Sequence, residues 1–120
     1  MIFVESRLFT KRVPELLGDE GYRELQNVLA RNPECGLVIP GCDGLRKIRT
    51  RLGAAGRGKR SGARVVYLHI PDANRCEMLL IYSKSEREDL SAKEKAILTD
   101  LAHRARSEAL AWARKKEEGT

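Results

Sequence analysis

A chain of 120 residues, 42% of them hydrophobic and with a formal net charge of +6, is long enough for one domain with one modest core. It contains no run of about 18 apolar residues of the kind that crosses a bilayer. Charges at Glu5, Arg7 and Lys11 interrupt the N-terminus where a secretory signal would be apolar. We therefore expect one cytoplasmic domain spanning residues 1–120.

The N-terminal third predicts a strand and then a short helix. Residues 2–5, IFVE, are mostly β-branched or aromatic, which is typical of a strand. A helix is expected over residues 7–13, and Pro14 is expected to close it because proline lacks the N–H that a helix needs.

A second helix is predicted over about residues 20–31. Apolar residues recur at helical spacing between Tyr22 and Leu29, Asp19 can cap the start, and the dipeptide at 32–33, Asn-Pro, ends the pattern. Residues 36–40, GLVIP, then favour a short strand that leads into a glycine-containing turn.

Three further strands are expected in the middle of the chain. They cover residues 45–52, 63–70 and 76–83, and residues 71–74 supply a turn between the last two. Consecutive strands joined in this way form an antiparallel meander. A flexible connection is predicted over residues 53–62, GAAGRGKRSG.

A long C-terminal amphipathic helix completes the predicted fold. Ser91 and Glu94 have the spacing of a capping box, in which each side chain satisfies a backbone N–H at the helix start. Ile97, Leu101 and Trp112 follow at spacings that place them, with Ala105, on one helical face. The element order indicates an α+β domain in which helices pack on one antiparallel sheet.

The positive charge is concentrated in one segment. Residues 44–71 contain eight of the 23 Lys and Arg and none of the 17 Asp and Glu, so the rest of the chain carries 15 cations and 17 acids, a net −2. The stretch from Gly53 to Lys59 comes close to a nucleotide-binding loop, but Arg60 stands where Ser or Thr would hold magnesium, and a strand follows in place of a helix.

Two interpretations of this basic segment stay open on the residues alone. It is either a hairpin tip with solvated cations or a surface for an anion, for which nucleic-acid phosphate is the obvious candidate. Cations on neighbouring strands favour the second interpretation, since they repel one another without an anion between them.

Other chemistry has weaker support in the sequence. His69 alternates with core positions on a strand, and His103 falls on the charged face of the last helix. Glu86, Glu88 and Asp89 suggest a solvated acidic run. Three cysteines at positions 35, 42 and 76 form no CxxC pair and have no histidine at metal-ligand spacing, so we expect reduced thiols and assign no metal and no cofactor.

Three motifs in this order resemble RelE-superfamily toxins, most closely the HigB branch. They are GLRKIR at 44–49, GRGKRSGARVVYLHI at 56–70 and LLIYSKSEREDLSAKEK at 79–95. The resemblance implies a compact RelE-like α+β domain and a metal-independent endoribonuclease that cuts mRNA in the ribosomal A site. It also implies a DNA-binding antitoxin of the HigA or RelB type as partner, and no membrane association.

The resemblance also implies roles for individual residues. Lys59, Arg64 and Lys84 are expected at the reacting phosphate with Tyr82 beside them, and Arg64 is the candidate for stabilising the transition state because its planar fork can bond two phosphate oxygens. Either lysine could act as base if neighbouring cations lowered its pKa. Contacts to mRNA and ribosomal RNA are expected from Arg46, Lys47, Arg49, Arg57 and Arg60.

The sequence leaves several roles open for Tyr82. It could stack on a base, donate a proton or be a structural strand tyrosine, and no tyrosine follows it, whereas some RelE-like toxins use one near the C-terminus. Two other functions for the whole chain also stay open. One is a non-catalytic RNA- or ribosome-binding module; the other is a RelE-like subunit of an operator-binding antitoxin complex.

Overall fold

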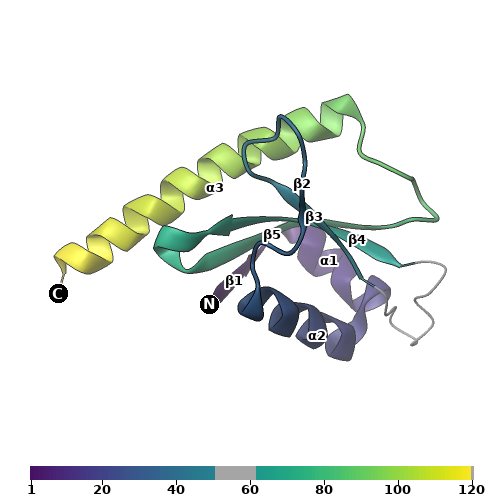
Figure 1. Ribbon diagram of the computed structural model, residues 1–120, viewed down its shortest axis with the longest axis horizontal. Coiled ribbons are helices and arrows are strands. Elements are labelled where there is room, and N and C mark those ends of the chain that lie inside the picture. Colours follow the sequence, from purple (N-terminus) through teal and green to yellow (C-terminus); the bar gives the residue numbers. More distant parts are fainter. Residues whose placement is uncertain (51–61, 120) are drawn as a thin grey trace.

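A computed structural model describes residues 1–50 and 62–119 of the chain (Figure 1). The elements follow in the order β1 (Ile2–Glu5), α1 (Arg7–Leu16), α2 (Gly18–Arg31), β2 (Leu37–Val38), β3 (Arg46–Arg49), β4 (Ala63–Ile70), a 3-10 turn (Pro71–Ala73), β5 (Arg75–Ser83) and α3 (Ala92–Glu118). The fold is therefore α+β, with a long C-terminal helix as predicted.

The five described strands form one sheet in the order β1-β5-β4-β3-β2. Strands β2 to β5 pair antiparallel, which confirms the predicted meander of β3, β4 and β5. The first strand, β1, instead pairs parallel with β5, so that Ile2 lies opposite Arg75. The predicted segment at 53–62 lies outside the described residues except for Gly62.

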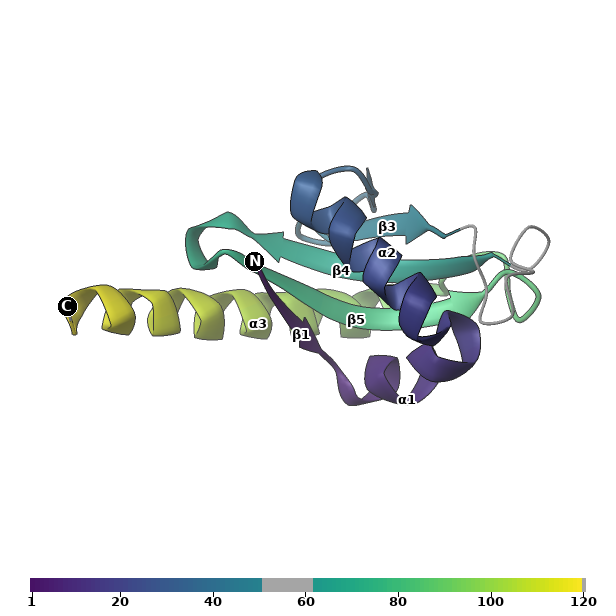
Figure 2. The same cartoon turned by 90° about the horizontal axis from the view of Figure 1, so that it is seen from below.

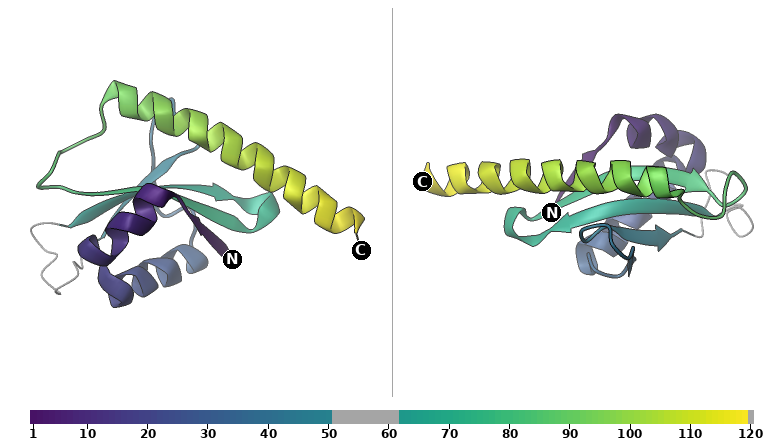
Figure 3. Two further views of the ribbon diagram at one scale, coloured as in Figure 1. Left: turned by 180° about the vertical axis from the view of Figure 1, so that it is seen from behind. Right: turned by 90° about the horizontal axis from the view of Figure 1, so that it is seen from above.

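Helices cover the two faces of this sheet (Figures 1 and 2). On one face, α1 and α2 bury residues such as Phe9 and Leu29 against Val65, Tyr67 and Met78. On the other face, α3 buries Leu98, Ala102 and Ala109 against the remaining strand residues. The C-terminal part of α3 extends past the end of the sheet (Figure 3).

A β-bulge in β5 decides which face its later residues occupy. Val66 pairs with Leu80 and Tyr67 pairs with Met78, so Leu79 is left over between the two pairs. Before the bulge, Cys76 and Met78 face α1 and α2, and after it Ile81 does so. Because the alternation shifts by one residue, Tyr82 faces the α3 side instead.

The bulge is tied to the start of α1. Ser6 is the N-cap of α1, and its hydroxyl accepts the N–H of Phe9 at 3.1 Å. The same hydroxyl donates to the Leu79 carbonyl at 2.7 Å, and the Ser6 N–H donates to the Met78 carbonyl at 2.9 Å. One serine thus satisfies backbone groups of both elements.

Several predicted boundaries of the helices are wrong. Helix α1 continues through Pro14 to Leu16, although proline cannot donate the backbone bond to Thr10, which is exposed. Asp19 does not cap α2. It lies in the first turn, after Gly18 has reversed the chain with a φ of 72°.

Three predicted strands differ in length from the observed ones. The strand predicted at 36–40 covers only Leu37–Val38, and the one predicted at 45–52 covers Arg46–Arg49 in the part that the structure describes. Strand β5 begins one residue earlier than predicted, at Arg75.

The apolar face of α3 that the sequence indicates is not the face that packs on the sheet. Ile97, Leu101 and Trp112 are 52%, 38% and 38% exposed, whereas Ala102 and Ala109 are fully buried. Both sets recur at helical spacing, and the small alanine side chains are the ones that let α3 approach the sheet closely.

None of the helices in the described part of the chain has a stretch long and apolar enough to span a membrane.

Candidate functional site

A row of three side chains crosses the sheet on the α3 side. Arg64 of β4 lies directly opposite Tyr82 of β5 on one side and Arg49 of β3 on the other. Directly opposed residues of neighbouring strands point to the same face, about 5 Å apart. Residues from three predicted motifs therefore meet in one line, which we call the arginine row.

Neither arginine of the row has an acidic partner among the described residues. The ion pairs of that part of the chain involve other cations, and the Arg64 side chain donates only to the Gly62 carbonyl, at 3.2 Å. Arg49 is exposed and Arg64 half-buried. Two adjacent guanidinium groups without a carboxylate favour binding of an anion between or above them.

Tyr82 is fully buried beside this row. Its side chain is 0% exposed, and its hydroxyl has no hydrogen-bond partner in the part of the chain that the structure describes. Burial raises the pKa of Tyr82, the charge of Asp89 raises it further, and the charges of Arg64 and Arg87 oppose the shift. The phenol is thus neutral at physiological pH and keeps a proton to donate, while its buried ring offers no face to a base.

Arg87 lies over the Tyr82 ring, a contact that sequence reasoning missed. The guanidinium carbon is 4.8 Å from the ring centroid, within the range of a cation–π interaction. The same side chain forms an ion pair with Glu94 in the first turn of α3. Spacing in the sequence carried no signal for this contact, because it depends on the path of the turn between β5 and α3.

All three members of the predicted solvated acidic run are exposed, and two of them also form ion pairs that the sequence did not predict. Asp89 accepts the N–H of Leu90 at 2.8 Å and pairs with Lys47 at 3.3 Å, so hydrogen bonds lower its pKa. Lys47 lies opposite Val66 and therefore on the same face as the row. Sequence alone could not pair it with Asp89, which is 42 residues away.

The Glu86 carboxylate accepts more hydrogen bonds than that of Asp89. Both of its carboxylate oxygens accept from Arg12 of α1, at 2.7 and 2.8 Å, and Oε1 also accepts the N–H of Ser83 at 3.1 Å. These bonds lower the pKa of Glu86 to about 2. The turn after β5 is therefore attached to α1 by a bidentate ion pair.

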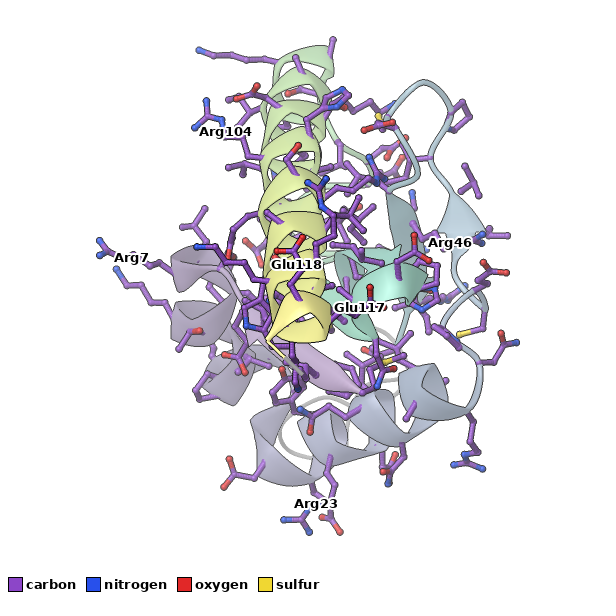
Figure 4. The ribbon with its side chains drawn as sticks, turned by 90° about the vertical axis from the view of Figure 1, so that its left-hand side faces the viewer. Arg7, Arg23, Arg46, Arg104, Glu117 and Glu118 are labelled. Atoms are coloured by element: carbon purple, nitrogen blue, oxygen red, sulfur yellow. The ribbon has the colours of Figure 1, made fainter. Side chains whose placement is uncertain are left out.

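Arg46 lies on the opposite face from the row. It pairs with Tyr67, which packs against α1 and α2, and its side chain donates to the carbonyls of Glu34 and Gly36 at 3.0 and 2.8 Å. Figure 4 shows it beside β2 and β3. The neighbouring Tyr67 hydroxyl donates to the Pro33 carbonyl at 2.8 Å and accepts from Gly36. Arg46 thus holds the loop before β2.

The remaining predicted site residues are placed as follows. Lys84 is exposed and directly follows β5, two residues after Tyr82. Arg57, Lys59 and Arg60 lie outside the described residues.

The two histidines lie on different elements, β4 and α3. His69 alternates with Tyr67 on β4 and so faces away from Arg64. His103 of α3 is exposed, and its Nδ1 is 3.1 Å from a carboxylate oxygen of Asp43.

Two of the three cysteine thiols are buried. Cys42 and Cys76 are buried and Cys35 is exposed, and burial raises the pKa of Cys76 to about 12. No three His, Cys, Asp or Glu side chains of residues 1–50 and 62–119 are grouped so as to hold a metal ion.

No protein-family model matches the chain.

Proposed function

We propose that this chain is the toxin of a type II toxin–antitoxin system, a cytoplasmic endoribonuclease that cuts translated mRNA on the ribosome. Two findings support the proposal. The three motifs that resemble HigB-type toxins occur in the expected order, and the arginine row unites residues from all three of them. The observation that carries it is that Arg49 and Arg64, beside Tyr82, have no acidic partner among the described residues.

The proposed reaction is attack by the ribose 2′-OH on the adjacent phosphorus. The 2′-oxygen forms a bond to phosphorus while the bond to the 5′-oxygen breaks, which leaves a 2′,3′-cyclic phosphate and a 5′-OH end. Negative charge grows on the phosphoryl oxygens in the transition state, and fixed guanidinium groups stabilise it without reorganising. Arg64, in the middle of the row, is assigned this role.

Two protons must move in this reaction. The 2′-OH loses one to a base, for which Lys84 is the candidate among the described residues, and the departing 5′-oxygen gains one from an acid. Tyr82 is assigned as the acid because its phenol is neutral and its hydroxyl has no other partner in the described chain. The hydroxyl is buried, so this role requires bound RNA to displace the groups that cover it. Arg49 and Lys47 are assigned to hold the RNA strand.

Mapping of mRNA 5′ ends in a translation extract tests the proposal. Wild type is expected to produce ends only when ribosomes occupy the message. Arg64→Ala is expected to slow cleavage about 100-fold or more, because it removes a preorganised charge from the transition state. Arg23→Ala is the matched control, since it removes the same charge from an exposed position on α2 that points away from the sheet (Figure 4).

A non-catalytic RNA-binding module is the second candidate, favoured by the same unpaired cations. Under that function, wild type shifts the mobility of RNA or ribosomes but produces no new ends in any condition. Arg64→Ala and Arg49→Ala would then weaken binding by similar factors, because each removes one phosphate contact. New ends from wild type that disappear in Arg64→Ala alone would exclude this alternative.

A further inference from the structure

The turn that follows β5 places Arg87 between the arginine row and α3. Its guanidinium lies 4.8 Å from the centroid of the Tyr82 ring and is also ion-paired with Glu94. The side chain of Arg87 is 31% exposed and that of Glu94 30%, so both lie at the rim of the fold and not within its core.

Glu94 connects this contact to a rigid element. One of its oxygens, Oε1, accepts the N–H of Ser91 at 2.9 Å as part of the capping box of α3, and the other pairs with Arg87. The capping box therefore fixes the orientation of the Glu94 carboxylate, and this carboxylate in turn orients Arg87. A charge held in this way is preorganised, since its position does not depend on a substrate.

The hydroxyl end of Tyr82 has no comparable support. Its oxygen has no hydrogen-bond partner in the described chain, so the ring is located only by core packing and by the cation on its face. Asp89, Arg64 and Arg87 are the charged groups that act on the phenol. Of these, Arg87 is the one in contact with the ring face.

We infer that Arg87, anchored by Glu94, is a positioning residue that orients the Tyr82 phenol for proton donation in the cleavage step. This inference rests on the proposed function, because the orientation of the phenol matters to the reaction only if RNA is cut. Loss of Arg87 uncovers one face of a ring that is otherwise held by core packing, and misplacement of a catalytic group by about 1 Å can cost up to about 100-fold in rate.

Three variants test the inference. Arg87→Ala removes the cation. Glu94→Gln removes the ion pair but keeps an oxygen that can accept the Ser91 N–H, so the capping box survives. Arg104→Ala is the control, because it breaks an exposed ion pair with Asp100 on the same helix and points away from the sheet (Figure 4).

The first readout does not involve RNA. The Tyr82 ring signal is followed by NMR of ring-labelled tyrosine and identified with Tyr82→Phe. Arg87→Ala is expected to shift this signal and to raise the pKa of the phenol further, since a favourable charge is lost. Glu94→Gln is expected to shift it in the same direction by less, and Arg104→Ala to leave it in place.

The second readout is single-turnover cleavage of mRNA as a function of the concentration of ribosomes carrying it. Arg87→Ala is expected to lower the maximal rate about tenfold, with the half-saturating concentration within about twofold of wild type. Glu94→Gln is expected to fall between Arg87→Ala and wild type. A loss confined to the half-saturating concentration would instead make Arg87 an RNA contact and overturn the inference.

Failure of the inference and failure of the proposed function look different. If wild type cuts mRNA and Arg87→Ala cuts it at the same maximal rate, or if the Tyr82 signal does not move, Arg87 does not position the phenol. If wild type produces no RNA ends with ribosomes present, the proposed nuclease fails in the wild-type arm, and the role of Arg87 in cleavage falls with it.

Discussion

Two charged side chains are buried at the start of β5, and one of them lowers the stability of the fold. Arg75 is 7% and Glu77 5% exposed, and both have a side-chain atom without a hydrogen-bond partner among the described residues. Burial raises the pKa of Glu77 more than the charge of Arg75 lowers it, and Glu108 raises it further. The charged form of Glu77 is therefore less favourable in the folded protein than in the unfolded chain, and it lowers the free energy of unfolding.

Glu77→Gln is therefore expected to stabilise the protein at neutral pH. A raised pKa means that the stability associated with Glu77 is fully present below the ordinary carboxyl value of 4.5 and decreases as pH rises through the folded value. We expect a gain of about 1 kcal/mol in the free energy of unfolding at neutral pH. Urea titrations above and below the carboxyl pKa measure it, and an equal difference at both would contradict the assignment.

The opposite pH dependence is expected for Glu86. Its pKa is lowered to about 2, so the stability from its bonds to Arg12 and Ser83 is present above the ordinary value of 4.5 and is lost as pH falls toward 2. Glu86→Gln should then destabilise at neutral pH and match wild type near pH 2. Acid unfolding followed by circular dichroism tests this. Glu88→Gln is a suitable control because Glu88 is exposed nearby.

At the scale of the elements, the bulge at Leu79 is what brings Tyr82 beside Arg64. Strict alternation from Cys76 through Met78 and Leu80 would place Tyr82 against α1 and α2. Its position depends instead on one extra residue, whose carbonyl is satisfied by Ser6 of α1. The site on one face of the sheet is thus fixed partly by a helix cap on the other.

Ser6 variants are expected to separate capping from support of the bulge. Ser6→Ala loses both functions and should destabilise the protein by about 1 to 2 kcal/mol. Ser6→Asp can still accept the Phe9 N–H but cannot donate to the Leu79 carbonyl. We expect Asp to recover little of the loss and the Tyr82 ring signal to shift in both variants. Full recovery of stability by Asp would mean that only the cap matters.

Much of the fold could be predicted from the sequence because its signals are local. The strands at 2–5 and 63–70 and the capping box at Ser91 depend on side chains within a few residues of one another. Arg64 could be singled out for the same reason, by its motif. The bulge, the contact of Arg87 with Tyr82 and the pairing of Lys47 with Asp89 depend on the path of the chain between distant elements.

The buried face of α3 was not predictable from periodicity for a different reason. Ile97, Leu101 and Trp112 form one apolar stripe, and Leu98, Ala102 and Ala109 form another about 100° around the helix. Hydrophobicity alone favours the larger side chains. The sheet accepts the smaller ones, since only they allow close approach of the helix.

For the whole molecule, the uneven charge distribution predicts that the RNA binding we propose is sensitive to salt. Each phosphate contact releases counterions, so the logarithm of the binding constant for single-stranded RNA falls with the logarithm of salt concentration by about 0.7 per contact. We expect Arg49→Ala and Arg64→Ala each to reduce this slope by about that amount. Filter binding across a salt series measures the slope, and Arg23→Ala should leave it unchanged; an equal reduction would point to diffuse attraction.

The parallel pairing of β1 with β5 joins the first strand of the chain to the last. While the protein is being synthesised, β1 leaves the ribosome long before its partner, which begins at Arg75. The arginine row is likewise complete only after Tyr82 has been synthesised. Arg87 gains its ion-pair partner only with Glu94 of α3. A nascent chain that has not reached Ser83 cannot hold the completed sheet, and one that has not reached Glu94 lacks the ion-pair partner of Arg87, so any activity of the row requires both segments.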